Sequence, residues 1–305
     1  MNLFVTRRAW LSYALVTTGF WGVWGAFAEF PTRYGFPETL VYVVWALTLI
    51  PPALYAMRRV GWRVQRDPRS LLLGALIGFT GAGGQMLLFH AVHTGPTYLI
   101  FPIIALSPVV TIALSMAFLK ERVTKVGALG VLLALITLPL FNYSPGGESG
   151  APGSQEAAWF VYALIILFAW GVQGYFMKLA NRSMDAESIF LYMTVTGLLL
   201  IPVALWMTDI TLPIEYGWRG PGLAAITQVL NAVGALTLVY AFRYGRALVV
   251  APLANAGAPM ITAAVSMLVL GVMPNSVTAV AMVLAFLAAA LLAIEPEDKL
   301  IEQPI

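Results

Sequence analysis

Long apolar stretches separated by short polar breaks run through the whole chain. Two of them, 129–140 and 277–294, are apolar on every side rather than along one stripe. A hydrocarbon core about 30 Å thick needs roughly 20 apolar residues per helix, whereas the strands of a membrane barrel alternate apolar and polar residues. Because these stretches do not alternate, they predict membrane-spanning helices and exclude a barrel.

The polar breaks divide the apolar stretches into two groups of five spans. The expected spans are 9–30, 38–57, 70–91, 96–119, 124–142, then 157–177, 187–208, 220–242, 247–271 and 276–294. We therefore expect an all-α integral membrane protein of ten transmembrane helices, with a first five-helix domain at 1–142 and a second at 157–294. Between them, 143–156 is rich in Gly, Ser and Pro and is expected to be an external linker. Residues 295–305 are expected to form a cytoplasmic tail.

The basic residues indicate how the chain is oriented. An even number of helices, ten, places both termini on the same side of the membrane. Of the 17 Lys and Arg residues, all except Arg33 and Arg219 fall in segments on that side. Cytoplasmic loops are enriched in Lys and Arg. The sequence thus predicts a multi-pass protein of the cell inner (plasma) membrane, with both termini cytoplasmic.

An internal repeat relates the two groups of helices. Residues 20–27 recur as 169–176, with five of eight positions identical at an offset of 149. Further positions match at an offset of 150, namely Ala82 with Ala232, Gly84 with Gly234, Leu88 with Leu238, Ala91 with Ala241, Gly95 with Gly245 and Pro102 with Pro252. Since five helices per copy is an odd number, the second copy starts on the opposite side, which predicts two inverted repeats.

The first span also resembles a cleaved signal peptide, with Ala26 and Ala28 around a possible cleavage site. Because this span carries one copy of the repeated segment, we expect it to be retained in the mature protein.

Composition agrees with this class of protein. The 305 residues are 60% hydrophobic and 10% charged, and the basic residues lie between spans, so no nucleic-acid partner is expected. The chain has no cysteine, no phosphate-binding Gly-Lys-Ser/Thr loop and no His-Glu-x-x-His motif. We therefore expect neither an enzyme nor a bound metal or cofactor.

Polar and aromatic side chains in the middle of spans are the candidates for a substrate cavity. A polar group in hydrocarbon costs several kcal/mol unless it is satisfied, so such residues face protein or a wet cavity. Trp usually gathers at membrane interfaces instead, and an aromatic lining suits flat or cationic solutes. Alternatively, the amides only form hydrogen bonds between helices, and the Trp side chains pack inside the protein or face lipid. The candidates are Gln85, Gln173, Gln228, Asn231, Asn255, Trp21, Trp24 and Trp170.

Two further features concern coupling and motion. His90 is the first candidate for proton coupling, because an imidazole titrates in the physiological range, and Glu29 is the second. Either side chain could instead be interfacial. Pro102 and Pro252 occupy equivalent positions and are expected to bend their helices. The bends either serve a rocking motion or are fixed features of the helix shape.

The run 103–111, Ile-Ile-Ala-Leu-Ser-Pro-Val-Val-Thr, followed by 118–124, Phe-Leu-Lys-Glu-Arg-Val-Thr, resembles the EamA unit. Two such units form the drug/metabolite transporter superfamily. The resemblance covers essentially the whole chain and implies a ten-helix carrier of small organic solutes. In this family a Glu usually follows the fourth helix. Here it is Glu121, but the repeat-equivalent residue is Val272, so we expect Glu121 to be a structural end cap.

The expected function is secondary active transport of a small organic metabolite by alternating access, with the lipid bilayer as its surroundings and a proton as the candidate coupling ion. The resemblance favours an exporter. A sugar or amine importer of the same fold is the alternative, and a membrane-embedded enzyme or a channel are alternatives of another class. An enzyme would need clustered His, Asp or Glu at membrane depth, and the sequence has no such cluster. Paired Pro and Gly in an inverted repeat favour a carrier with moving halves over a channel.

Overall fold

The computed structural model describes residues 9–28, 30–94, 104, 106–141, 157–270, 275–292 and 294, in which every regular element is helical. The predicted linker, the predicted tail, Glu29 and Pro102 lie outside these residues. The elements of the first half are α1 (Ala9–Phe27), α2 (Phe30–Arg33), α3 (Glu38–Thr48), α4 (Ile50–Arg59), α5 (Pro68–Thr94), α7 (Ser107–Leu114), the π-helical turn η1 (Ser115–Leu119) and α8 (Lys125–Phe141).

The second half has its long helices in the same order, but its π-helical turn precedes the third long helix instead of following the fourth. Its elements are α9 (Ala157–Ala180), α10 (Ala186–Leu199), α11 (Ile201–Met207), the π-helical turn η2 (Trp218–Gly222), α12 (Leu223–Tyr244), α13 (Ala247–Leu270) and α14 (Ser276–Leu292). Five helical segments in the described residues are long and apolar enough to cross a membrane. The fold is the expected all-α membrane fold of ten helices in two inverted five-helix repeats.

Two spans that the apolar pattern predicts as single helices are broken in the middle. The chain leaves ideal helical geometry at Leu49, between α3 and α4, and at Leu200, between α10 and α11. Pro51 and Pro202 follow two residues later, and proline lacks the backbone donor that would continue the helix. The triplet Leu-Ile-Pro occurs at both breaks, at an offset of 151. The spans formed by α3 with α4 and by α10 with α11 are therefore interrupted at equivalent points.

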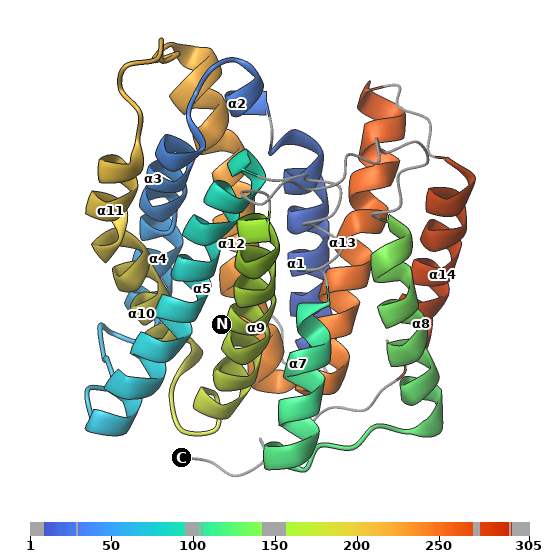
Figure 1. Cartoon of the computed structure of the whole chain (residues 1–305). Coiled ribbons are helices and arrows are strands. Elements are labelled where there is room, and N and C mark those ends of the chain that lie inside the picture. The colour runs from blue at the N-terminus through green and yellow to red at the C-terminus, as the bar shows by residue number, and fades with distance from the viewer. Residues whose placement is uncertain are drawn as a thin grey trace.

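The two halves exchange their first helices. α1 packs against α12 and α13 of the second half, and α9 packs against α5 and α7 of the first half. α1 runs upward to α2 and α9 runs downward toward α10 (Figure 1), so these equivalent helices are antiparallel. The main hydrophobic core draws residues from both halves, and neither half buries its first helix on its own.

Close helix packing repeats at equivalent places in the exchanged contacts. The hydroxyl of Thr262 donates to the carbonyl of Gly22 at 2.8 Å, and the hydroxyl of Thr111 donates to the carbonyl of Gly171 at 2.8 Å. A Cβ on either glycine would overlap a side chain of the facing helix. Small residues let membrane helices approach until a hydroxyl reaches the neighbouring backbone. The repeated glycines are thus contact points between the halves.

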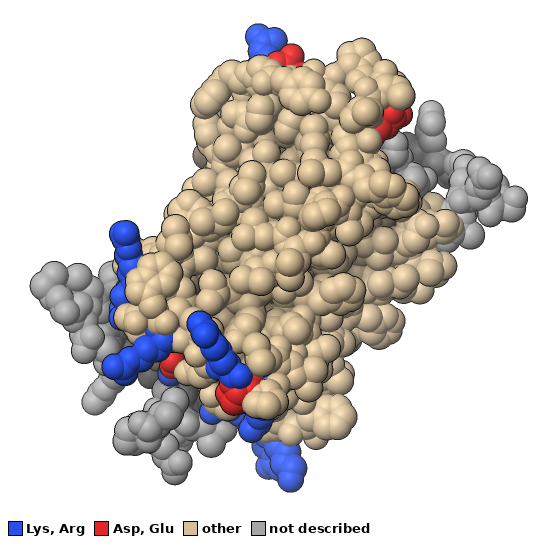
Figure 2. Space-filling model, turned by 90° about the vertical axis from the view of Figure 1, so that its left-hand side faces the viewer, with Lys and Arg blue, Asp and Glu red and all other residues tan. Residues whose placement is uncertain are grey.

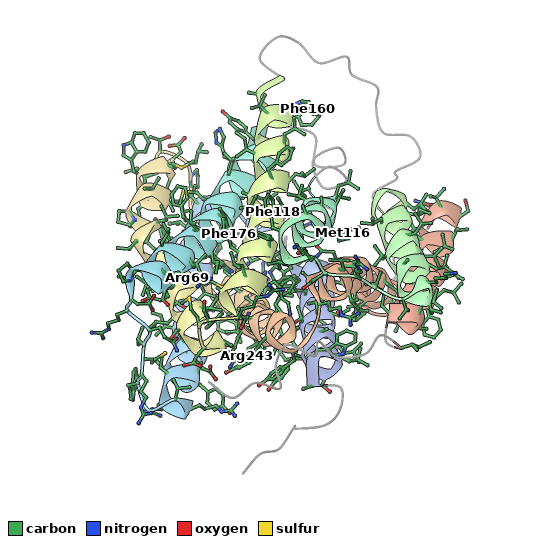
Figure 3. The ribbon with its side chains drawn as sticks, turned by 90° about the horizontal axis from the view of Figure 1, so that it is seen from below. Arg69, Met116, Phe118, Phe160, Phe176 and Arg243 are labelled. Atoms are coloured by element: carbon green, nitrogen blue, oxygen red, sulfur yellow. The ribbon has the colours of Figure 1, made fainter. Side chains whose placement is uncertain are left out.

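Most Lys and Arg side chains gather at one end of the molecule, which we name the basic end and which is the lower end in Figure 1. In Figure 2 the Lys and Arg side chains cluster below a wide belt of uncharged residues, and Figure 3 looks onto this end, where Arg69 and Arg243 are labelled. Described residues at this end include Arg58, Arg59, Arg63, Arg66, Arg69, Arg182, Arg243 and Arg246, whereas Arg33 and Arg219 lie at the opposite end. This charge separation matches the sequence pattern.

Candidate substrate site

Three buried amide side chains lie on α5 and α12, which are the third helices of the two repeats. Gln85 is 8% exposed, Gln228 is 2% exposed and Asn231 is 8% exposed. Within the described residues, no hydrogen bond reaches the amides of Gln85 and Gln228 or the amide nitrogen of Asn231. Each of these amides therefore has hydrogen-bonding groups available to a polar molecule.

The orientation of the Asn231 side chain is determined by Trp45 on α3. The indole N–H of Trp45 donates to Oδ1 of Asn231 at 2.8 Å. Because an indole nitrogen only donates, the oxygen of the amide must face Trp45 and the NH₂ group must point the other way. Sequence reasoning did not select Trp45, although it is a mid-span Trp like those that were selected.

Trp21 and Trp170 make equivalent contacts between the halves. The indole N–H of Trp21 donates to the carbonyl of Asn231 at 3.3 Å, and that of Trp170 donates to the carbonyl of Gly81 at 3.4 Å. Gly81 and Asn231 are themselves equivalent at the offset of 150. The half-buried rings therefore join the first helix of one repeat to the third helix of the other. The indole nitrogen of Trp24 is buried, with no partner among the described residues.

The other two predicted amides differ in their surroundings. Gln173 on α9 lies directly against Gly81, so that a Cβ at that glycine would overlap its amide nitrogen. Asn255 on α13 donates to the carbonyl of Ala251 at 2.9 Å, one turn earlier in its own helix. Pro252 is buried within α13, which runs without interruption from Ala247 to Leu270. The bend at Pro252 stays a prediction.

His90 lies near the end of α5, away from the basic end. Its ring meets Tyr162 of α9 edge-on, with 5.2 Å between ring centroids. The side chain is half-buried, which permits contact with solvent. Coupling to a proton at His90 is untested, and Glu29 lies outside the described residues.

A buried ion pair at the basic end was not predicted as a pair. Lys178 lies 4.0 Å from Glu121, and the two side chains are 3% and 4% exposed. Lys178 donates to the carbonyls of Phe242 and Gly245 at 3.1 and 2.6 Å, and Glu121 accepts from the backbone N–H of Leu248 at 3.2 Å. The cation thus meets carbonyls at the end of α12 and the carboxylate meets the start of α13, which suits both helix dipoles. The end-cap role expected for Glu121 stays a prediction, supported by its hydrogen bond with the start of α13.

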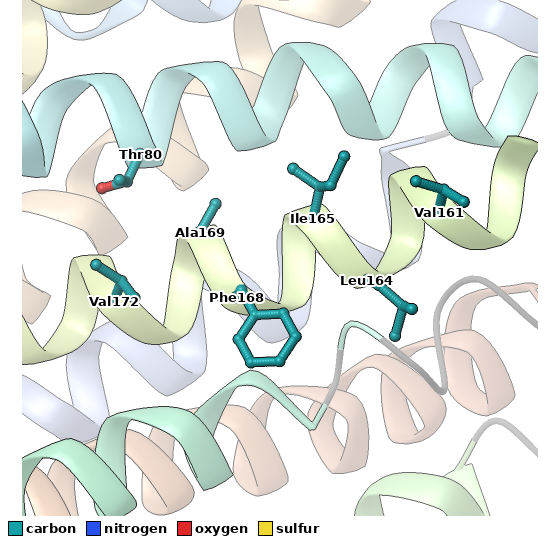
Figure 4. Close-up of a pocket in the computed structure, with 7 residues that line it drawn as sticks. All are labelled: Thr80, Val161, Leu164, Ile165, Phe168, Ala169 and Val172. Carbon is teal, nitrogen blue, oxygen red and sulfur yellow. The ribbon is translucent and has the colours of Figure 1, made fainter.

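A groove between α5 and α9 has a volume of about 410 Å³ (Figure 4). Its lining is apolar apart from one hydroxyl, and Phe168 in it is 56% exposed, as a lipid-facing side chain would be. None of the predicted site residues lines this groove. Its lining residues are Thr80, Val161, Leu164, Ile165, Phe168, Ala169 and Val172.

Comparisons with known proteins agree with the repeated fold. The model of the EamA-like transporter family matches residues 8–143 and again 157–294. Protein RarD of Streptomyces exfoliatus is 26% identical over 280 residues, which cover 88% of this chain and 81% of that protein. An uncharacterized protein of Methanocaldococcus jannaschii is 34% identical over 61 residues, which cover 20% of this chain and 44% of that protein.

A solved crystal structure superposes with a TM-score of 0.76 over 93% of this chain and 98% of that chain, at 17% sequence identity. At that identity the match shows a shared fold.

Proposed function

The chain belongs to the EamA-like transporter family, within the drug/metabolite transporter superfamily, and we propose that it is a secondary carrier that moves a small organic solute by alternating access. Family membership indicates a membrane transporter rather than an enzyme. Inverted repeats, with a site near the membrane midplane between them, are common among carriers that alternate between two orientations. The exchanged first helices of the two halves fit such an arrangement.

The observation that carries the proposal is the set of unsatisfied amides on α5 and α12. Gln85, Gln228 and Asn231 come from equivalent helices of opposite halves, and none of them is charged. The NH₂ group of Asn231, turned away from Trp45, suits an oxygen acceptor on the solute. Trp21, Trp24, Trp170, Gln173 and Asn255 complete the proposed site. Recognition would then depend on hydrogen bonds and aromatic faces rather than on an ion pair.

We propose that the basic end is cytoplasmic and that the membrane is a bacterial-type inner membrane. The clustering of Lys and Arg at that end supports this orientation. Export is the proposed direction, supported by the family resemblance. An importer of a sugar or an amine is the alternative, and the direction of gradient-driven flux separates the two.

A proton is the proposed coupling ion, with His90 as the group that carries it. The half-buried imidazole lies beside Tyr162, and the equivalent residue of the other half is Tyr240. Only one half therefore offers an imidazole at this position.

Thermal-shift measurements on purified protein test the site. The panel of test solutes should contain neutral, zwitterionic and cationic compounds. Each compound is paired with a close analogue that lacks its oxygen acceptor. A solute at 100 times its Kd stabilises the protein by about 2.7 kcal/mol. We expect acceptor-bearing solutes to give shifts that Asn231→Leu abolishes.

Thr80→Val is the matched control, because the Thr80 hydroxyl bonds to its own helix and lines the lipid-facing groove. It should keep every shift. Shifts that persist in a folded Asn231→Leu protein would place the site elsewhere.

A further inference from the structure

Five arginines lie on or beside the loop between α4 and α5, at the basic end. Residues 58–69 contain these arginines and a single acidic residue, Asp67. The carboxylate of Asp67 accepts hydrogen bonds from the backbone N–H and the hydroxyl of Ser70 at 3.0 and 2.6 Å, and so caps the start of α5. Among the described residues, no ion pair or hydrogen bond reaches the exposed guanidinium groups of Arg58, Arg63 and Arg69. The charge of this loop is therefore available to an anion.

Gln65 fixes the loop to the second half of the molecule. Its side-chain nitrogen donates to Oδ2 of Asp185 at 2.7 Å, and its side-chain oxygen accepts from the backbone N–H of Asp185 at 3.0 Å. Its backbone N–H donates to the hydroxyl of Ser188 at 3.3 Å, and its carbonyl accepts from the hydroxyl of Tyr192 at 2.6 Å. These hydrogen bonds hold the loop against the start of α10, so the backbone that presents the arginines is fixed in place.

Trp62 lies in the same loop, in a backbone conformation that bulky residues rarely adopt. Its φ is 60°, next to Gly61 at 64°, and the residue is 56% exposed. Left-handed geometry is unfavourable for a residue with a Cβ, and where it persists it often serves a function. Trp is enriched at the level of the lipid headgroups in membrane proteins. An exposed Trp beside unpaired arginines therefore suits the surface of a bilayer.

Exposed apolar side chains continue from the arginines along both helices. Leu54 lies one turn before Arg58 on α4 and is 47% exposed. Leu72 lies one turn after Arg69 on α5 and is 61% exposed. Because residues three or four apart share a helix face, each helix offers a cation next to an apolar surface. A phospholipid has the same order, with a phosphate next to its acyl chains.

We propose that the loop between α4 and α5 is a binding site for an anionic phospholipid, with the three unpaired arginines at its phosphate and Trp62 beside its headgroup. A guanidinium binds phosphate oxygens in a bidentate manner, and clustered basic residues at the ends of membrane helices recognise anionic headgroups. The site is separate from the proposed substrate site, so its test does not depend on transport.

Thermal midpoints of the purified full chain in an uncharged detergent, measured over a series of lipid concentrations, give an apparent Kd. The probes are phosphatidylglycerol and phosphatidylcholine with the same acyl chains. Since one basic residue near an anionic lipid surface strengthens binding about fivefold, we expect phosphatidylglycerol to bind roughly tenfold more tightly. The triple variant Arg58→Gln, Arg63→Gln, Arg69→Gln should lose this preference. A preference that survives in the folded triple variant would overturn the proposal.

The matched control removes the same charge from another connection at the basic end. Lys120→Gln, Arg122→Gln, Lys125→Gln changes three exposed residues between η1 and α8 (Figure 1) and should keep the preference for phosphatidylglycerol. An equal loss in both triple variants would mean that the whole basic end attracts anionic lipid, and would overturn a site on this loop. Inorganic phosphate should not raise the midpoint at the same concentrations. A shift with phosphate that needs the loop arginines would make this a site for free anions instead.

Trp62→Gly gives a second test that keeps every charge. Glycine adopts a positive φ without strain, so the midpoint without lipid should stay the same or rise. The apparent Kd of phosphatidylglycerol should rise roughly two- to fivefold, because the indole no longer packs beside the headgroup. A lower midpoint with an unchanged Kd would show that Trp62 serves packing alone, and would contradict the proposal.

Discussion

At the scale of single residues, Asn231 is where packing and recognition meet. Its backbone carbonyl accepts from Trp21 and its side-chain oxygen accepts from Trp45, which leaves the NH₂ group as the donor that can bind a solute. The bond from Trp45 therefore orients the side-chain donor, while the bond from Trp21 joins α1 to the backbone of α12. A site assembled in this way is sensitive to the residue that orients the amide as well as to the amide itself.

Trp45→Phe tests this positioning role. The variant keeps an aromatic ring on α3 but frees the Asn231 amide to rotate. Because one hydrogen bond contributes about 0.5–1.5 kcal/mol, the Kd of the solute should rise roughly 2- to 12-fold. Isothermal titration measures the Kd, and the ligand-free melting temperature shows whether packing survives. An unchanged Kd in a well-folded variant would contradict the role of Trp45.

His90→Gln tests proton coupling at the same scale. Glutamine keeps hydrogen bonding but does not titrate near neutral pH. We expect uptake into proteoliposomes to lose its dependence on the pH gradient, while exchange of solute across the membrane stays largely intact. Gradient dependence that survives in this variant would exclude His90 and make Glu29 the next residue to change.

At the scale of helices, the ends of α12 and α13 depend on one buried ion pair. Lys178 donates to carbonyls at the end of α12 and Glu121 accepts from one backbone N–H at the start of α13, so the pair secures the connection between these helices. Removing one partner leaves the other charge buried and alone, which costs far more than an exposed pair would.

Lys178→Met should therefore destabilise the protein by about 3–5 kcal/mol. The thermal midpoint of the protein in detergent measures the loss. Adding Glu121→Gln to that variant removes the stranded charge and should recover part of the stability. If Lys178→Met melts like the parent protein, the pair contributes nothing to the fold.

The helices also show what sequence patterns can and do not predict. Apolar runs and the offsets of 149 to 151 predict ten spans and their inversion, because both depend on membrane thickness and chain order. The breaks at Leu49 and Leu200 were not predicted, although the Leu-Ile-Pro triplet was present twice. The site amides stand out as polar residues in apolar helices. Trp45, the partner of Asn231, and Lys178, the partner of Glu121, are brought to these residues by packing between distant segments. The periodicity of apolar residues along the chain does not report such packing.

At the scale of the whole molecule, the exchange of first helices makes each half depend on the other. The hydrogen bonds of Trp21 and Trp170 and the ion pair of Lys178 with Glu121 all lie where helices from the two halves meet. Motion of one half against the other would therefore change every one of these contacts together, which is the behaviour expected of an alternating-access carrier.

Orientation in the membrane is a testable consequence of the charge asymmetry. Single cysteines at Arg63, exposed at the basic end, and at Ser149, in the predicted external linker, suit an impermeant thiol reagent. In intact cells we expect labelling of Ser149→Cys but not of Arg63→Cys. The reverse pattern would place the basic end outside.

The most direct test of the central claim, that this molecule is a carrier with one alternating site, is counter-exchange in proteoliposomes. The solute with the largest thermal shift is loaded in labelled form, and unlabelled solute is added outside. The binding site of a carrier returns to the inner side faster when it carries solute than when it is empty, so external solute should accelerate efflux of the label. Asn231→Leu should remove this acceleration. Efflux that ignores external solute, as through an open pore, would contradict the account.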